Sequence, residues 1–271
     1  TNVDLDLEKL LGWKGGTIHA NAYYVHGIGP TTNTGSSSAV SNLAGFETVR
    51  RDELWFEQGL LDDKLKLKFG AVAADTEFYV RDTAGAVLNG TFGWAGILAT
   101  NMVQGGPAYP LTAMGARAQF APTDNLTILA GIFNGSPANP YADDSQKSNR
   151  HGTDFRFGDG ALLIVEGAFR YDIGLAGTVK VGGWRQFDAP DGIYQDFNTG
   201  ETVNQASGLY AIVDQQIWKN GDDQSVSIFG RVSGSPTSHS VMDMYFDTGV
   251  VFSGFVPGRA KDAFGAAFGW G

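Results

Sequence analysis

Apolar and polar positions alternate along much of this chain, most clearly between residues 51 and 71. This stretch reads RDELWFEQ, then GLLDD, then KLKLKFGA. Because successive side chains of a β-strand point to opposite sides, the lysines of the second arm share one face, and Leu65, Leu67 and Phe69 share the other. The first arm is expected to place four large side chains on one face: Arg51, Glu53, Trp55 and Glu57. The pattern predicts a hairpin with one charged and one apolar wall.

The same alternation predicts twelve strands. They are expected at residues 2–10, 16–27, 46–58, 64–74, 109–121, 125–135, 160–172, 177–188, 206–219, 224–235, 240–254 and 262–271. Most of these segments exceed the roughly 5–6 residues usual in soluble proteins. They reach the roughly 9–11 residues that a strand needs to cross a bilayer.

The connections between these strands alternate between short and long. The short ones are 11–15, 59–63, 122–124, 173–176 and 220–223, and the long ones are 28–45, 75–108, 136–159 and 189–205. Outer-membrane barrels keep the turns at one end tight and let the external loops grow. A soluble Greek-key sandwich gives no reason to sort loop length in this way. The fold class is therefore expected to be all-β, an up-and-down antiparallel transmembrane β-barrel.

The long, partly apolar loop 75–108 has two possible positions. It folds into the lumen or packs externally on its neighbours, and the sequence leaves both open.

Composition narrows the class of protein further. The formal charge of −10 and the pI of about 4.7 argue against a nucleic-acid partner, which requires basic surface. The chain has no cysteine, so it has neither a disulfide framework nor a thiolate metal site. No apolar run reaches the roughly 18 residues of a membrane helix. No linker or shift in composition divides the chain, so residues 1–271 are expected to form one domain.

No sequence motif of a catalytic or metal site indicates an enzyme. The four histidines do not have the spacing of a metal site, and no nucleophile elbow, phosphate-binding loop or dinucleotide fingerprint occurs. Glu53 and Glu57 are expected about 13 Å apart along a strand, at about 3.3 Å per residue. Glycosidase carboxylates lie roughly 5–9.5 Å apart. We therefore expect no enzyme, no metal and no cofactor.

If the strands close a barrel, one face of each is aliphatic and the other combines charges with aromatic rings. Such a lumen offers a sugar stacking and hydrogen bonding, each weak enough to permit release. The candidate pore-lining residues are Arg51, Glu53, Trp55, Glu57, Lys68, Arg117, Glu166, Arg170, Lys180, Trp184, Arg231 and Asp243. The alternatives are that the charges cover the solvated face of an ordinary sheet, and that the tryptophans form an interfacial girdle or pack in a core.

Several long blocks resemble the carbohydrate-selective porin family of the OprB type. They are LDLEKLLGWKGGTIHANAYYVHG (5–27), RDELWFEQGLLDDKLKLKFG (51–70), AADTEFYV (73–80), YPLTAMGARAQFAPTDNLTILAGIFNG (109–135), NRHGTDFRFGDGALLIVEGAFRY (149–171), GLYAIVDQQIW (208–218) and DTGVVFSGFVPGRAKDAFGAAF (247–268). The resemblance implies a sixteen-stranded barrel whose constriction uses arginine and glutamate flanked by aromatic residues. The best candidates for the constriction in this chain lie in the hairpin of residues 51–71. They are Arg51, Glu53, Trp55 and Glu57 of its first arm, with Lys68 across the hairpin.

The chain departs from this family pattern in the number of strands. With about twelve strands, we expect one to be missing before Thr1 and about three after Gly271; a closed twelve-stranded barrel is the competing explanation. The resemblance implies a Gram-negative outer-membrane channel for neutral sugars. Its partners would be membrane lipid and small sugars, and a homotrimer remains open. The alternatives are a soluble or secreted all-β carbohydrate-binding protein, and an outer-membrane enzyme or receptor built on a barrel.

Overall fold

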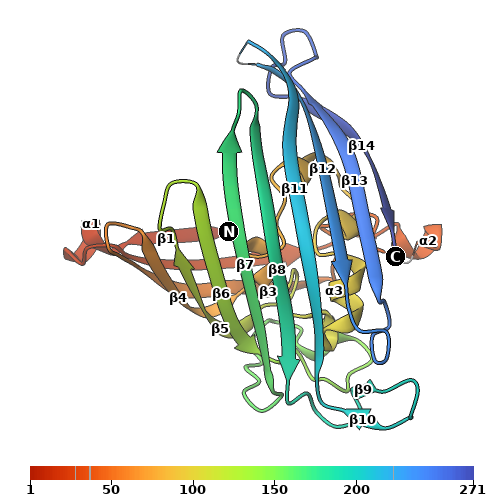
Figure 1. Cartoon of the computed structure of the whole chain (residues 1–271). Helices are drawn as coiled ribbons and strands as arrows, with labels where there is room; N and C mark the ends of the chain where they lie inside the picture. The colour runs from red at the N-terminus through yellow and green to blue at the C-terminus, as the bar shows by residue number, and fades with distance from the viewer. Residues whose placement is uncertain (28, 37, 222) are drawn as a thin grey trace.

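The computed structural model describes residues 1–27, 29–36, 38–221 and 223–271. Its main feature is one curved antiparallel sheet of twelve strands in chain order, with a separate hairpin, β9–β10, in one loop (Figure 1). The strands of the sheet are β1 (Asn2–Asp6), β2 (Gly16–Val25), β3 (Thr48–Leu60), β4 (Leu65–Val72), β5 (Ala113–Phe120), β6 (Leu126–Asn134), β7 (Ala161–Asp172), β8 (Ala176–Phe187), β11 (Ala206–Asn220), β12 (Gln224–Gly234), β13 (Met244–Ser253) and β14 (Ala263–Trp270). Within the described ranges, β1 and β14 each pair on one side only.

All twelve predicted strands are present, so the all-β, up-and-down architecture is confirmed. The short turns lie at one end of the sheet and the long loops at the other (Figure 1). The first predicted strand is too long, because helix α1 (Leu7–Leu11) follows β1 directly. The Asp6 side chain caps this helix by accepting from two backbone N–H groups, and Gly12, at φ 72°, ends it.

The predicted strands 109–121 and 240–254 also begin too early, since β5 starts at Ala113 and β13 at Met244. The hairpin of β9 (Tyr194–Gln195) and β10 (Thr202–Val203) was not expected. The connections contain helices α2 (Thr31–Thr34), α3 (Gly96–Asn101) and α4 (Ser145–Ser148), and 3-10 turns η1 (Ala74–Thr76), η2 (Thr83–Ala86), η3 (Gly90–Phe92) and η4 (Val103–Gly105). None of the helices in the described ranges combines the length and the apolar content needed to span a bilayer.

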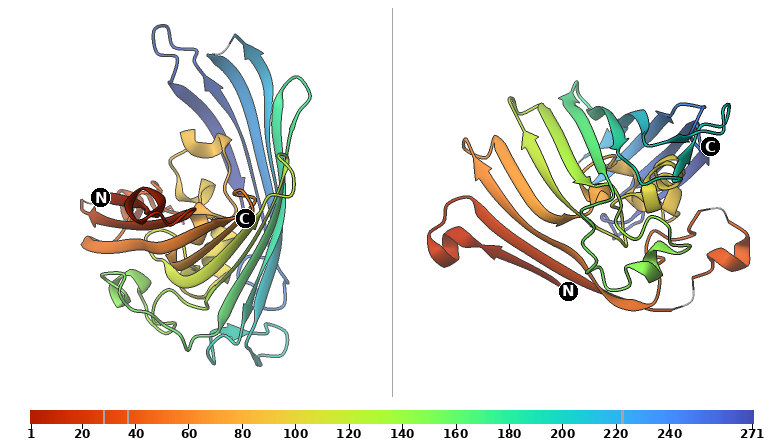
Figure 2. Two further views of the ribbon diagram at one scale, coloured as in Figure 1. Left: turned by 90° about the vertical axis from the view of Figure 1, so that its left-hand side faces the viewer. Right: turned by 90° about the horizontal axis from the view of Figure 1, so that it is seen from below.

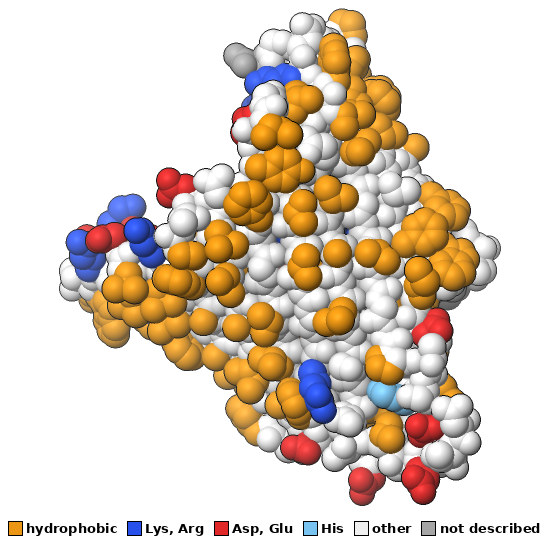
Figure 3. Space-filling view, in the orientation of Figure 1, with side chains coloured by type: hydrophobic (Ala, Val, Ile, Leu, Met, Phe, Trp, Pro, Cys, Tyr) orange, Lys and Arg blue, Asp and Glu red, His pale blue; other side chains and the backbone are white. Residues whose placement is uncertain are grey.

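The sheet has a concave inner face and a convex outer face (Figure 2). Large apolar side chains are exposed along the outer face, which Figure 3 shows in orange; they include Leu54, Phe69, Phe120, Ile128, Ile132, Val165, Phe169, Val181, Leu209 and Val232. No second sheet packs on this face among the described residues. The alternative in which these side chains form a sandwich core is therefore wrong.

The buried core lies on the inner face, beneath the long connection between β4 and β5. We call residues 73–112 of this connection the inner loop; Figure 2 shows it inside the curve of the sheet. Phe78, Ile97 and Leu98 of the inner loop pack in one cluster with strand side chains such as Ile164 and Ile212. Of the two positions left open for this loop, the structure has the one inside the lumen.

Candidate functional site

Polar side chains of the inner face hold the backbone of the inner loop. They come from strands that are far apart in the sequence, and they bind residues 73 to 83 in order. Glu53 Oε1 accepts from Ala73 N at 3.1 Å, Glu166 Oε2 accepts from Tyr79 N at 2.9 Å, Lys180 Nζ donates to Val80 O at 2.6 Å, and Asp214 Oδ1 accepts from Thr83 N at 3.1 Å. These contacts fix the loop across the concave face.

A four-residue ionic cluster anchors the start of the inner loop. Glu57, Lys68 and Arg117 lie opposite one another in a single row across β3, β4 and β5. Glu77 of the loop completes the cluster. Arg117 Nη2 lies 2.7 Å from Glu57 Oε2, and Arg117 Nε lies 2.8 Å from Glu77 Oε2. Lys68 Nζ donates to Glu77 and lies 3.9 Å from Glu57 Oε2. We call these four residues the β3–β5 cluster.

The β3–β5 cluster is electrically balanced, with two cations and two carboxylates. Burial alone would raise the pKa of Glu77, but the charges of Lys68 and Arg117 outweigh burial and lower that pKa below its ordinary value. The Glu77 carboxylate therefore stays ionised. Its charge ties the loop to two strands at once.

Next to this cluster, an aromatic row crosses β1, β2 and β3. His19 stands opposite Asp4 and Trp55 in the strand register. Its ring stacks on Trp55 with centroids 4.7 Å apart and an interplanar angle of 14°. Asp4 Oδ1 lies 2.6 Å from His19 Nδ1, and Lys68 Nζ lies 3.8 Å from the Trp55 ring centroid. The Trp55 Nε1 and His19 Nε2 atoms have no protein partner among the described residues. The row thus combines stacked rings and charges, with both of these ring nitrogens buried.

A second ionic cluster anchors the middle of the inner loop on β12 and β13. Asp247 accepts from Arg231 Nη2 at 2.6 Å and also from Arg81 of the loop. Arg231 reaches two loop carbonyl oxygens, Thr91 O at 2.8 Å and Gly93 O at 2.9 Å. Burial and the nearby Arg231 charge lower the pKa of Arg81 to about 10, so its guanidinium remains charged near neutral pH.

Tyr79 joins the second cluster to the neighbouring strands. Its ring centroid lies 4.0 Å from the Arg231 guanidinium and 4.7 Å from the Tyr210 ring centroid. Tyr210 in turn donates its hydroxyl to Glu166 Oε2 at 2.8 Å. Burial raises the pKa of Tyr79 to about 12, so its hydroxyl is neutral. Aromatic packing, as well as charge, therefore holds the inner loop at Tyr79.

Seven candidates from the sequence lie in these contacts on the inner face, and one further candidate packs beneath the loop. The seven are Glu53, Glu57, Lys68, Arg117, Glu166, Lys180 and Arg231. Trp55 lies beside them in the aromatic row. Trp184 is buried in the core cluster under the inner loop, which agrees with the alternative of core packing.

Arg51 lies apart from the other candidates. A bulge in the pairing of β2 and β3 sets Asn21 opposite two residues, Asp52 and Glu53, which are both buried. The alternation before the bulge is out of phase with that after it, so the expectation that Arg51 and Glu53 share a face is wrong. Arg51 Nε donates to Gly152 O at 2.8 Å, in the loop between β6 and β7.

Two further candidates lie at strand ends. Asp243 is exposed in the turn before β13, since that strand begins one residue later; the buried acid of β13 is Asp247. Arg170 is exposed near the short-turn end of β7. With Asp82 and Asp214 it lines a cavity of about 280 Å³.

The sequence-based candidates missed the residues of the inner loop itself. Glu77, Tyr79 and Arg81 occur in a segment without strand alternation, so no pattern marked them as partners of the wall. Asp247 lies on the same face of the predicted strand as Asp243, so the polar alternation pointed to both residues equally. His19 also had a signal, because it lies on a strand at the position facing Trp55.

A cavity of about 530 Å³ lies among the inner loop and two external loops. Its lining includes Trp94, Tyr109, Asn42 and Gln146. Trp94 Nε1 donates to Gly105 O at 2.8 Å, so this ring is fixed in place. Within the described ranges, no three His, Asp or Glu side chains converge to hold a metal ion.

Comparisons with known proteins agree with this geometry. The model of the family described as "Carbohydrate-selective porin, OprB family" matches residues 1–271. Porin B of Pseudomonas aeruginosa is 25% identical over an alignment 288 residues long, which covers 97% of the chain and 61% of that protein. The high-pH structure of Pseudomonas putida OprB superposes with a TM-score of 0.79 at 24% identity, covering 98% of the chain and 66% of that structure. For the low-pH structure the TM-score is 0.57 at 16% identity, with 99% and 67% covered. The chain thus spans about three fifths of the length of the curated relative that it matches.

Proposed function

Because the chain belongs to the carbohydrate-selective porin family OprB, we propose that it forms the wall and the constriction of a channel through which neutral sugars diffuse. Porins of this family lie in the Gram-negative outer membrane and are channels, not enzymes. Membership in this family argues against the alternatives, which were a soluble carbohydrate-binding protein and an outer-membrane enzyme or receptor on a barrel.

The observation that carries the proposal is the anchored inner loop. A flexible loop would block or leave a lumen at random, whereas this loop is held by two buried ionic clusters on opposite parts of the wall. Such an arrangement supports a constriction of fixed shape. Glu53, Arg117, Glu166, Lys180 and Arg231 act in it as positioning residues.

Sugar contact in this proposal falls to the aromatic row and its neighbours. An aromatic ring stacks on the C–H face of a pyranose, and charged groups bind its hydroxyls. The stacked pair of Trp55 and His19 supplies the aromatic surface, and the Glu57 side chain retains 19% exposure beside it. Contacts of this kind bind weakly, and weak binding lets a sugar leave again. The cavity near Trp94 serves as an external vestibule.

The proposal is tested by conductance of the full-length porin in planar bilayers, with increasing concentrations of a neutral hexose. We expect sugar to reduce the ion current saturably. Trp55→Ala should raise the half-blocking concentration about two- to tenfold, the equivalent of an aromatic contact worth about 0.5–1.5 kcal/mol. Trp218→Ala is the matched control, because that ring is exposed and contacts Phe255 away from the inner loop.

The outcomes separate the function from the site. If no channel forms, or if sugar leaves the current unchanged, the proposed function is wrong. If sugar blocks the wild type and Trp55→Ala equally, the function stands and the aromatic row is not the sugar site.

A further inference from the structure

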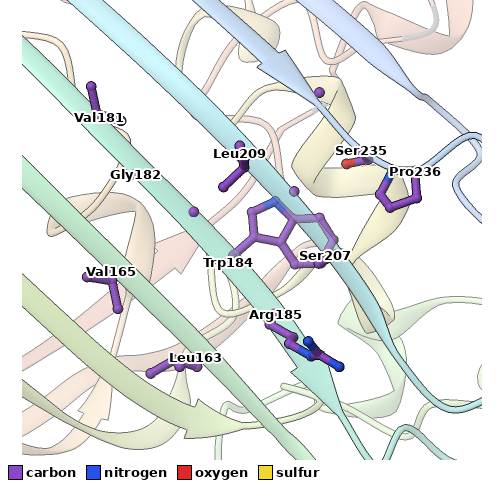
Figure 4. A pocket seen from close by; sticks show the side chains of 13 residues that line it. Leu163, Val165, Val181, Gly182, Trp184, Arg185, Ser207, Leu209, Ser235 and Pro236 are labelled. Carbon is purple, nitrogen blue, oxygen red and sulfur yellow. The ribbon is translucent and has the colours of Figure 1, made fainter.

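A groove of about 910 Å³ opens on the outer face, over β7, β8, β11 and β12 (Figure 4). One cross-strand row forms its floor, in the order Val165, Gly183, Leu209 and Gly234. Every second residue of this row lacks a side chain. The Leu209 side chain covers Gly183, where an added Cβ would lie 2.7 Å from Leu209 Cδ2, whereas the surface over Gly234 is open. Val165 and Leu209 are 42% and 74% exposed, which makes the groove apolar and open outward.

The groove ends in polar side chains toward the long loops. Arg185 lies opposite Leu163 and Ser207 in the next row and close to the end of β8 (Figure 4). The end with long loops faces outward in outer-membrane barrels. Arg185 is therefore at the depth of the outer-leaflet headgroups.

Arg185 retains donors for a ligand. Its Nη2 donates to Gln205, and no hydrogen-bond partner of its Nε or Nη1 occurs among the described residues. Ser235 also lines the groove, and its Oγ is buried without a partner in the described part of the chain. A guanidinium binds phosphate through paired N–H donors, more strongly than it binds a neutral group.

We propose that this groove is a binding site for a phosphate-bearing glycolipid of the outer leaflet. One acyl chain lies beside Leu209 and over Gly234, and a phosphate binds Arg185. The apolar lining of the groove suits a hydrocarbon chain, and the positive charge of Arg185 complements an anionic headgroup, as in the basic pockets of membrane proteins that bind lipid head groups. The site is on the opposite side of the sheet from the lumen, so it is independent of sugar passage.

The test is native mass spectrometry of the full-length porin in a neutral detergent. The probes are lipid A with both phosphates and its dephosphorylated form. We expect one tightly held phosphorylated lipid per chain. Arg185→Gln should weaken its retention about tenfold or more, because hydrogen bonds to a charged group are lost. Arg185→Lys should keep part of the retention, and binding of the dephosphorylated form should not respond to either change.

Filling the groove gives the second arm of the test. A Cβ at Gly234 would have only Asp243 O within 4 Å, at 3.8 Å, so the backbone there accepts a side chain such as that of Gly234→Leu. This variant should reduce retention of both lipids. Gly230→Leu, on the same strand and face but outside the groove, is the control; a Cβ there has its nearest neighbour at 3.5 Å.

Three results would overturn the proposal. Equal retention of both lipids by the wild type and by Arg185→Gln would mean non-specific annular contact. Equal effects of Gly234→Leu and Gly230→Leu would mean that the groove holds no chain. A change of oligomeric state in Gly234→Leu without a change in lipid retention would make the groove an interface between copies of the chain. Each variant is first checked for folding by its mobility on unheated gels.

Discussion

Replacing Glu77 by glutamine should loosen the start of the inner loop while the barrel stays folded. The change removes one of the two carboxylates that balance Lys68 and Arg117, whose side chains are 8% and 4% exposed. Removing one partner of a buried ion pair costs about 3–5 kcal/mol. Glu57 still lies 2.7 Å from Arg117, so we expect the lower end, about 3 kcal/mol. That corresponds to about a hundredfold change in the docking equilibrium of the loop.

Hydrogen exchange measured by mass spectrometry reports this equilibrium. The amides of residues 73–81 should exchange about a hundredfold faster in Glu77→Gln, because Phe78 N and its neighbours are protected by bonds within the loop. The strand peptide 161–172 should not change. In the double variant Lys68→Met with Glu77→Gln, charge balance returns and most of the protection should recover. Unchanged protection of 73–81 in Glu77→Gln, or an equal change in both peptides, would refute the reasoning.

Three further predictions concern pH, depth and backbone geometry. Burial raises the pKa of Asp75 to about 7, and its Oδ2 accepts from Tyr109 N. The folded state then holds one more proton than the unfolded state between about pH 4 and 7, so loop docking weakens as pH rises through this window. Hydrogen exchange near Tyr109, corrected for intrinsic rates, should be faster at pH 8 than at pH 5. Asp75→Asn should abolish the difference. Phe69→Arg lies mid-strand on the outer face and should cost about 2–4 kcal/mol of assembly free energy, as measured by refolding into vesicles. Leu65→Arg lies beside the short turn and should cost only about 0–1 kcal/mol in the same assay. Gly70→Val should prevent assembly, seen as loss of the unheated gel form, because Gly70 has φ +137° and a Cβ there would lie 2.3 Å from a backbone oxygen of the facing strand.

The sequence predicted the local pairs of the wall well. Alternation placed Glu57 and Lys68 on the charged wall of the same hairpin, where the structure sets them opposite each other. The exact register was not predicted, because the expected turn 59–63 is longer than the one that joins Leu60 and Leu65. The same logic failed for Arg51, because one bulged residue reverses every later assignment and leaves no clear mark in the sequence.

The path of the inner loop could not be predicted in the same way. Tyr79 and its partner Glu166 are 87 residues apart, and Arg81 and Asp247 are 166 apart. Contacts at such separations depend on the curvature of the whole sheet, which local patterns do not encode. The loop therefore remained undecided between lumen and exterior, although the wall half of its anchoring sites was visible as polar strand positions.

Passage of neutral sugars through a lumen of fixed shape is tested most directly by swelling of liposomes that contain the full-length porin. The account predicts that a neutral hexose enters faster than an anionic sugar acid of the same size, and faster than a neutral trisaccharide. Swelling no faster than in protein-free liposomes, or equal rates for all three solutes, would contradict it.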